Sequence, residues 1–314
     1  MIVNRVLDHG RNELKKVIVG QQELINHCLL AVLCQGHALL EGVPGIAKTL
    51  VIKAFARLFA LDFKRVQCTS DLMPADIIGS NVLNLATSTF SLHRGPLFTD
   101  FLLADEINRM PPRTQAALLE SMEERQLTID GVTYPLSGFF TVFATQNPIE
   151  FEGTYPLPEA QLDRFLLKIN VAYPEAEQEV TILKNHHEGF DPHKLSESQI
   201  EQMSPDLLAE ARAELKSVRV EPALFRYIVE IVRRTRDWPS FSLGASPRAA
   251  VSLMMVAKGH AALEDRDYMI PDDVKAAAKP VLRHRVMLRP EAELEGLQSD
   301  QVLNEVIGSV EVPK

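Results

Sequence analysis

Apolar residues recur along the first 170 positions in two alternating patterns: short uninterrupted runs, and longer stretches with helical spacing. Uninterrupted runs are typical of parallel strands that are covered on both faces, and the spaced stretches predict helices between them. This alternation predicts an α/β fold, with a parallel sheet flanked by helices. The runs expected to form its strands are residues 37–40, 63–68, 101–104, 139–144 and 165–171.

The pattern changes near Tyr173-Pro174, after which we expect helices and no further strands. A core over residues 1–172 and an all-helical lid domain over residues 173–314 are therefore predicted. After Pro290 we expect the chain to end in a short mobile tail. Prolines at the first helical position mark helix starts at Ser204-Pro205, Glu221-Pro222, Ser246-Pro247 and Ile270-Pro271. The apolar faces expected in the second and third of these helices are Leu224, Ile228, Ile231 and Val232, then Val251, Leu253, Met254 and Met255.

Two insertions interrupt the core pattern, at about residues 70–97 and 126–138. The first predicts a short helix and a hairpin, and the second alternates around Asp130-Gly131, a strong hairpin signal. Arg94 is the only lysine or arginine in the first insertion, and the second has none. Gripping a nucleic-acid backbone, which depends on basic side chains, is therefore poorly supported.

The first apolar run leads into Gly42-Val43-Pro44-Gly45-Ile46-Ala47-Lys48-Thr49, and a helical stretch continues from Leu50. Strand, glycine-rich loop and helix in this order suit polyphosphate, because backbone N–H groups and the helix dipole converge on one point. We expect Lys48 to contact the β and γ phosphates and Thr49 to bind Mg²⁺. An ordinary Gly-Pro turn is the simpler alternative. Ala47 departs from the strict motif, which has glycine before the lysine.

The third run ends abruptly in Asp105-Glu106. Ligands of parallel sheets bind at the carboxyl ends of strands, so Asp105 is expected to hold Mg²⁺ and Glu106 to orient the attacking water. A solvated acidic turn is the alternative for such a pair. Asn147 follows the next strand to the same edge, where it could hydrogen-bond the γ phosphate or the water. By itself, Asn147-Pro148 is a turn signal.

Three further positions are candidates for the same site. Val19-Gly20-Gln21, in a short turn ahead of the phosphate loop, could form an adenine pocket or simply separate two helices. Arg164 could pair with Asp163 or Glu159, or could stabilise charge on a phosphoryl group bound by a neighbouring subunit. Arg248 lies in the first turn of a predicted helix, where a positive charge suits the helix dipole poorly. It is therefore a better ligand candidate than Arg233, Arg234 or Arg236, which are expected on a solvated face.

Composition narrows the class further. The chain has 314 residues, 46% of them hydrophobic and 24% charged, with a net charge of −9. Neither half has the basic excess of a nucleic-acid-binding protein. The three cysteines lack zinc-site spacing, so we expect buried, reduced thiols, as in cytosolic proteins. The longest apolar runs fall short of the ~20 residues of a membrane span, and we expect a cytoplasmic protein.

Taken together, these residues resemble the AAA+ ATPases, and most closely the MoxR family in the group that carries an insertion in its second helix. Residues 42–49 resemble the family's phosphate loop, including alanine before the lysine. Asp105-Glu106 resembles its Walker B motif, and Val19-Gly20-Gln21 its adenine-side segment. By the same resemblance, Asn147 would be sensor 1, Arg164 the arginine finger and Arg248 sensor 2.

The resemblance implies a homohexameric ring with ATP and Mg²⁺ at the subunit boundaries. It also implies a chaperone-like role in remodelling or activating client proteins or metalloenzymes, with a von Willebrand factor A domain protein as adaptor. Two alternatives stay open, a DNA-associated AAA+ motor and a magnesium-chelatase-like subunit. Whether Arg248 acts within its own chain or across a boundary is also open.

Overall fold

The computed structural model describes residues 1–42, 48–85, 88–147, 153–191, 195 and 200–313. Its centre is a five-stranded sheet in the order β2–β5–β8–β1–β9, and all neighbouring strands are parallel. The predicted α/β core is confirmed. The strands are β1 (Ala38–Glu41), β2 (Phe63–Gln67), β5 (Phe101–Asp105), β8 (Thr141–Gln146) and β9 (Leu167–Asn170).

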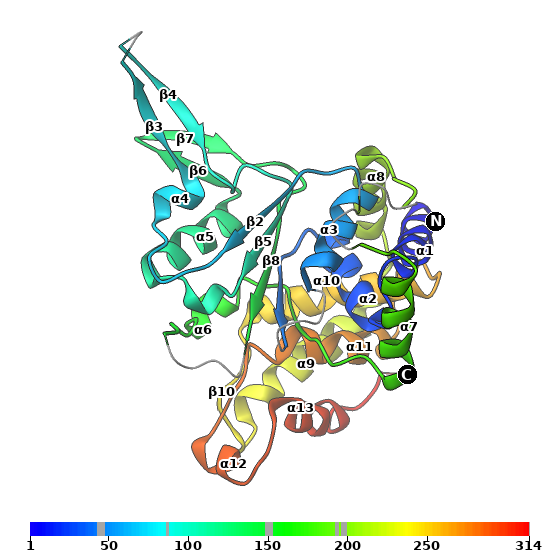
Figure 1. Cartoon of the computed structure of the whole chain (residues 1–314). Helices are drawn as coiled ribbons and strands as arrows, with labels where there is room; N and C mark the ends of the chain where they lie inside the picture. Colours follow the sequence, from blue (N-terminus) through cyan, green and yellow to red (C-terminus); the bar gives the residue numbers. More distant parts are fainter. Residues whose placement is uncertain (43–47, 86–87, 148–152, 192–194, 196–199, 314) are drawn as a thin grey trace.

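Helices cover both faces of this sheet (Figure 1). Alternate residues of β5 show why its sequence is apolar throughout: Phe101 and Leu103 belong to one hydrophobic cluster, and Leu102 and Ala104 to the other. The first cluster contains α1 (Ile2–Lys15), α2 (Gln22–Leu33) and α3 (Lys48–Leu58). The second contains α4 (Pro74–Ile78) and α5 (Pro112–Glu124). The short helices η1 (Ile107–Arg109) and α6 (Glu159–Leu162) follow β5 and precede β9.

Both predicted hairpins are present and extend from the α5 side of the core (Figure 1). They are β3 (Gly79–Asn84) with β4 (Thr89–Arg94), and β6 (Gln126–Ile129) with β7 (Val132–Pro135). The Asn81 side-chain amide donates to Asp130 Oδ2 at 2.8 Å, which joins the two hairpins. At the root, a Cβ added to Gly95 would lie 2.3 Å from the backbone oxygen of Ile77, so this packing requires glycine.

The second half of the chain is mainly helical. The four helix starts predicted from proline are confirmed. The helices are α7 (Ala176–His187), α8 (Pro205–Lys216), α9 (Pro222–Asp237), α10 (Pro247–Leu263), α11 (Pro271–Leu282), α12 (Pro290–Leu294) and α13 (Ser299–Gly308). The domain boundary near residue 173 stays a prediction.

Two expectations for this half are wrong. β10 (Phe241–Leu243) and β11 (Met287–Leu288) form a small antiparallel sheet, and strands this short leave no periodic pattern. Val251 was expected in the core, but the residue is 54% exposed. Most of the segment after Pro290 is packed, because α13 buries Val302, Leu303, Val306 and Ile307, and the short mobile tail expected after it stays a prediction.

Buried polar contacts tie the helical half to the core. Arg212 of α8 donates from Nε to the backbone oxygen of Val32 at 2.9 Å, and from Nη1 to that of Gly138 at 3.1 Å. These bonds join α8 to the end of α2 and to the segment before β8. Among the described residues, none of the helices is both long and apolar enough to cross a membrane.

Candidate nucleotide site

Lys48 is the first residue of α3 and points back towards the end of β1. Its Nζ donates to the backbone oxygen of Gly42 at 2.5 Å. Burial lowers the pKa of the Lys48 ammonium, and the negative charges of Asp105, Glu106 and Glu41 act against this shift. The lysine is therefore within electrostatic reach of three carboxylates. Thr49 and Leu50 follow it in the first turn of α3, and both are half-buried. The predicted site residues Val43, Pro44, Gly45, Ile46 and Ala47 lie outside the described residues.

Asp105 is the last residue of β5, and other side chains hold both of its carboxylate oxygens. Thr145 Oγ1 donates to Oδ1 at 2.6 Å, and Arg65 Nη2 lies 2.7 Å from Oδ2. Thr145 is buried in β8. This threonine therefore fixes the carboxylate from inside the sheet, whereas Arg65 holds it from the surface.

Glu106 adopts a left-handed backbone conformation, with φ 59° and ψ 54°. A residue other than glycine rarely occupies this region, and such strain persists only where neighbouring groups maintain it. Here the backbone N–H of Glu106 donates to Thr145 Oγ1 at 2.8 Å. The carboxylate receives the side-chain amide of Gln67 at 3.4 Å and lies 2.9 Å from Arg109 Nε. The strained turn directs Glu106 away from the line of β5.

The ends of three strands bring these residues together. Gly42, directly after β1, donates its N–H to the backbone oxygen of Gln146 at 3.3 Å. Asn147 is the next residue and is buried. Asp105 pairs with Gln67 at the end of β2. Lys48, Asp105 and Asn147, which are predicted to contact phosphate or Mg²⁺, therefore lie at the carboxyl edge of one parallel sheet.

Val19-Gly20-Gln21 connect α1 to α2 next to this edge. Gly20 has a φ of +84°, a conformation that glycine adopts without strain. The side-chain amide of Gln21 donates to the backbone oxygen of Ala172 at 3.0 Å, just after β9. Ile18 is buried, while Val19 is partly accessible. The segment is thus held beside the strand that neighbours β1.

Arg164 and Arg248 lie together, and Glu123 of α5 bonds to both. Arg248 Nη1 donates to the two carboxylate oxygens of Glu123 at 2.8 and 3.0 Å, and Arg164 Nε donates to Oε2 at 3.1 Å. Burial acts to raise the pKa of Glu123, but the hydrogen bonds and charges of the two arginines outweigh it, so the pKa is lowered. The alternative partners considered for Arg164, Asp163 and Glu159, are not the ones it contacts here.

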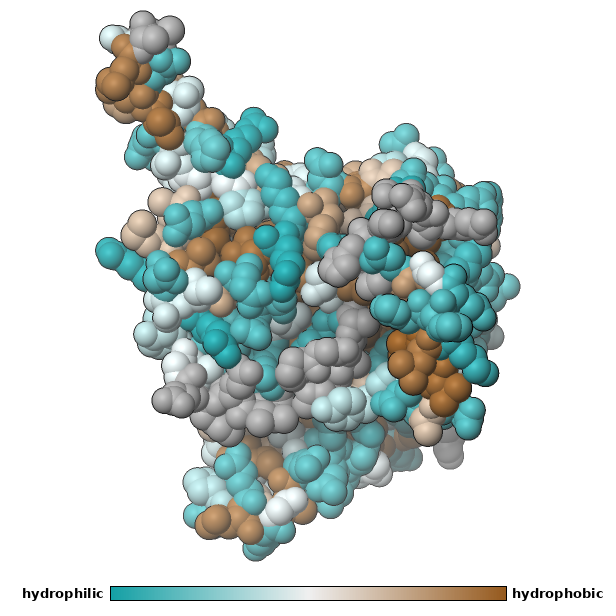
Figure 2. Space-filling model, in the orientation of Figure 1, coloured by the Kyte–Doolittle hydropathy of each residue, from teal (hydrophilic) through white to brown (hydrophobic). Residues whose placement is uncertain are grey.

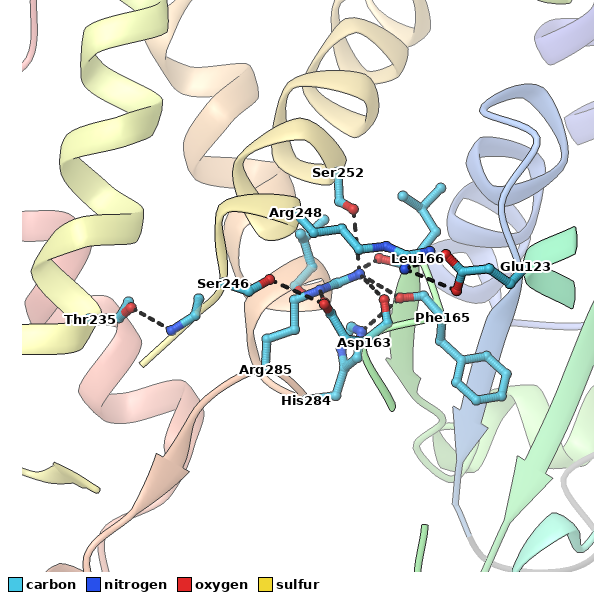
Figure 3. A network of polar contacts seen from close by, with 12 residues as sticks. Glu123, Asp163, Phe165, Leu166, Thr235, Ser246, Arg248, Ser252, His284 and Arg285 are labelled. Carbon is cyan, nitrogen blue, oxygen red and sulfur yellow. Dashed lines mark hydrogen bonds and ion pairs between the residues drawn. The ribbon is translucent and has the colours of Figure 1, made fainter. Parts of the chain in front are cut away.

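A third arginine, Arg285, holds Asp163 (Figure 3). Arg285 Nε donates to Asp163 Oδ1 at 2.6 Å, and Ser246 Oγ donates to Oδ2 at 3.1 Å. Ser246 directly precedes α10, the helix that carries Arg248. Asp163 thus fixes the start of α10 against the segment that carries Arg164.

The arginine pair lies at the opposite edge of the sheet from Lys48 and Asp105. Arg164 and Arg248 line a pocket of about 240 Å³ with Gln35, Gly36 and His37, which precede the first residue of β1. Gly42 follows the last residue of β1. At about 3.3 Å per residue, the four residues of β1 separate the two edges by about 13 Å.

Family models match two parts of the chain. Residues 37–167 match the ATPase family associated with various cellular activities (AAA), and residues 233–306 match the AAA lid domain. The first match contains β1, β5, β8 and both hairpins. The second contains Arg248.

Relatives match nearly the whole chain. The protein YeaC of Bacillus subtilis is 43% identical, across 99% of this chain and 95% of its own. The chaperone MoxR1 of Mycobacterium tuberculosis is 42% identical, across 98% of this chain and 82% of its own. The chain belongs to the MoxR family of AAA+ ATPases. A crystal structure from Cytophaga hutchinsonii, described as that of a candidate ATPase, is 41% identical, with a TM-score of 0.91 over 99% of this chain and 96% of its own.

The MoxR assignment is favoured over the magnesium-chelatase alternative. A magnesium-chelatase subunit ChlI homologue from Methanocaldococcus jannaschii is only 26% identical, across 66% of this chain and 56% of its own. The sequence prediction of a MoxR-type AAA+ protein, with a helical lid after the α/β core, is confirmed.

Four residues in the candidate nucleotide site and around the arginine pair were not predicted from the sequence: Arg65, Gln67, Glu123 and Thr145. Thr145 had a usable signal, because it is a polar residue at the end of an apolar run, two positions before Asn147. Glu123 had none, since it is one of several glutamates on the polar side of α5. Its partners come from α10 and from the segment before β9, and only the fold brings these together.

Proposed function

We propose that this MoxR-family protein binds ATP with Mg²⁺ and hydrolyses it. The convergence of Lys48, Asp105, Glu106 and Asn147 at one sheet edge carries the proposal. Lys48 binds the β and γ phosphates, Glu106 orients and polarises the attacking water, and Asn147 contacts the γ phosphate or that water. The strained backbone of Glu106 supports this role, because the turn presents its carboxylate at the edge rather than along the strand.

The oxygen donors at this edge fit Mg²⁺, which prefers carboxylate and hydroxyl oxygen ligands. Asp105 and Thr49 would hold the ion, and the bound ion would neutralise charge on the phosphates. Thr145 keeps the Asp105 carboxylate in one orientation through a 2.6 Å hydrogen bond. Arg65 is nearly half exposed and can leave Asp105 Oδ2 without disturbing a packed core. We propose no role for Arg65 beyond balancing this carboxylate before Mg²⁺ binds.

Arg164 and Arg248 complete the site of a neighbouring subunit rather than their own. Their guanidinium groups bond to Glu123 at the amino edge of the sheet, about 13 Å or more from Gly42 at the carboxyl edge. A head-to-tail arrangement of identical chains brings one edge of each chain to the other edge of the next, and it forms a ring when the rotation between neighbours closes on the first chain. This supports the ring implied by the family resemblance, and it assigns Arg248 to act across the boundary.

Hydrolysis is tested with Glu106→Gln. We expect the variant to bind ATP as the wild type does, while its turnover falls by orders of magnitude, because the amide cannot polarise the water. Phosphate release and the binding of a fluorescent ATP analogue would measure the two properties. Glu120→Gln is the matched control, since Glu120 is exposed on α5. Normal turnover in Glu106→Gln would remove this role from Glu106.

The client is proposed to be a protein, contacted by the two hairpins. Val82, Leu85 and Phe90 are exposed on or beside the β3–β4 hairpin, and Val132 is exposed on the β6–β7 hairpin. The far end of the projecting hairpin is correspondingly apolar in Figure 2. Exposed apolar side chains with few basic residues favour polypeptide over nucleic acid, which a DNA motor would need to grip through its phosphates. A von Willebrand factor A domain adaptor remains part of the proposal through the family resemblance.

A further inference from the structure

Helix α7 exposes its apolar side chains to solvent, whereas an ordinary surface helix buries them. All twelve of its residues are described, and none of them is buried. The side chain of Gln178 faces the protein, where a Cβ added to Gly20 would lie 2.3 Å from its Oε1. Val180, Ile182 and Leu183 are exposed instead, and Leu183 is 70% accessible. An amphipathic helix normally buries its apolar side, so this face of α7 lacks a partner among the described residues of the chain.

The exposed aliphatic side chains form a patch. Val180 and Leu183 are three positions apart, which places them on the same side of the helix, and Ile182 flanks Leu183. Figure 2 shows the corresponding apolar area over α7, surrounded by hydrophilic surface. An apolar area with a polar rim is typical of a protein–protein contact. We call Val180, Ile182 and Leu183, with the exposed Glu177 and Glu179 at the start of the helix, the α7 face.

The α7 face borders the nucleotide site. The segment leading into α7 begins at Val171, whose N–H donates to the backbone oxygen of Glu41 at 2.7 Å. A Cβ added to Gly42 would lie 2.6 Å from the backbone oxygen of Val171. The next residue, Ala172, accepts the hydrogen bond from Gln21. Residues 171–175 therefore start beside Gly42, pass the segment Val19-Gly20-Gln21 and lead directly into α7.

The surface that carries Arg164 and Arg248 is complementary to the α7 face. Val251 is one turn beyond Arg248 on α10, is 54% exposed and lines the same pocket as Met255. Among the described residues that line that pocket, four are arginines and two are carboxylates, Glu123 and Asp163. The Arg164/Arg248 surface thus combines apolar side chains with an excess of positive charge. The α7 face combines apolar side chains with acidic ones, so the two surfaces are complementary. The four arginines are Arg125, Arg164, Arg248 and Arg285.

We propose that the α7 face docks on the Arg164/Arg248 surface of a second copy of this chain. In this contact, α7 brings the partner's arginines to the edge of the nucleotide site that they complete. Glu177 and Glu179 attract that surface, and Val180 and Leu183 become buried against it. The inference rests on the proposed function in one respect, namely that the two arginines act in a neighbouring copy.

Leu183→Lys tests the contact, with Leu294→Lys as the matched control. Leu183 is 70% and Leu294 89% exposed, so neither change affects a packed core, and a lysine at position 183 would face the arginines of the partner surface. With ATP present, light scattering should show that Leu183→Lys needs at least a tenfold higher concentration to assemble, whereas Leu294→Lys assembles as the wild type does. Leu183→Lys should still bind a fluorescent ATP analogue as a single chain. Assembly of Leu183→Lys at the wild-type concentration would overturn the proposal.

Cross-linking identifies the partner surface. Cys28, Cys34 and Cys68 are all buried, so introduced cysteines would be the accessible thiols. A mixture of Leu183→Cys and Val251→Cys chains, treated with a short bismaleimide in ATP, should give a linked dimer that neither variant gives alone. Leu294→Cys mixed with Val251→Cys should give none. Equal linkage in both mixtures would contradict the docking. These results are independent of whether Arg164 affects hydrolysis, so the contact and the proposed function can fail separately.

Discussion

Mixing two arginine variants gives a decisive test of how the site is completed. Arg164 and Arg248 share Glu123, so both guanidinium groups lie on one surface, about 13 Å or more from the phosphate edge of their own chain. A hydrogen bond requires donor and acceptor to approach within about 3.2 Å. We therefore expect each nucleotide site to take both arginines from the same neighbouring chain. Arg164→Ala and Arg248→Ala should each be inactive, and mixing them should restore nothing.

The magnitude follows from counting the boundaries in a mixed ring. At each boundary one chain binds the nucleotide and its neighbour supplies Arg164. In an equal mixture, the nucleotide-binding chain is Arg164→Ala, which keeps Arg248, and the neighbour is Arg248→Ala, which keeps Arg164, at about a quarter of the boundaries. If Arg248 served its own chain, these boundaries would be intact, and about one quarter of the wild-type rate would return. On the geometry described here, every boundary lacks one arginine, and the rate stays lower by a factor on the order of 10³.

A second mixture serves as the positive control. Lys48→Ala chains keep both arginines, and Arg164→Ala chains keep the phosphate site. Their equal mixture should therefore recover about one quarter of the wild-type rate, because a quarter of the boundaries pair the intact halves. Steady-state phosphate release would be measured after co-assembly is verified by light scattering. Recovery in the arginine mixture that equals the control would refute the shared surface, and no recovery in either mixture would refute action across boundaries.

Thr145 and the buried histidines give two further predictions. Thr145→Val removes the acceptor of the Glu106 N–H and the donor to Asp105, so we expect slower hydrolysis and a loss of about 1–3 kcal/mol in urea unfolding, while Thr145→Ser restores both. Burial lowers the pKa of His37 to about 3 and the pKa values of His27 and His260 to about 4. As the pH falls below about 6.5, the ordinary pKa of histidine, these side chains therefore bind protons in the unfolded chain but not yet in the folded chain. Stability should be complete above about pH 6.5 and fall towards pH 4, by up to about 1.4 kcal/mol per pH unit for each histidine. An unchanged urea midpoint between pH 7 and pH 5.5 would contradict this.

The fold was largely predictable, because the sheet is covered on both faces. Runs such as Phe101–Ala104 leave few alternatives to a central parallel strand, and the order of these runs with the phosphate loop gives the architecture. The prolines at 205, 222, 247 and 271 marked helix starts through their fixed φ. The two short strands β10 and β11 left no pattern, and their pairing depends on contacts between residues more than 40 positions apart.

The candidate site was predictable only where its residues follow an element in sequence. Asp105 and Asn147 come directly after strands, so the direction of the sheet places them. The role of Glu123 depends on three segments that meet only in the folded chain. Val251 shows the opposite failure: helical spacing alone predicted burial, but the residue faces away from the core beside Arg248. An apolar side chain that faces a second molecule cannot be distinguished by periodicity from one that faces the interior.

Helix α5 links distant parts of the molecule as a stiff rod. It contains 13 residues and is therefore about 20 Å long. Near its start, Thr114 Oγ1 donates to the backbone oxygen of Leu72, just ahead of α4 and the β3–β4 hairpin. Near its end is Glu123, and the β6–β7 hairpin begins three residues later. Under the proposed function, Arg164 and Arg248 exchange Glu123 for a neighbour's phosphate, which removes their ion pairs from one end of α5. Because the roots of both hairpins are attached to this helix, we expect ATP binding by one subunit to shift the apolar hairpins of the subunit that supplies the arginines.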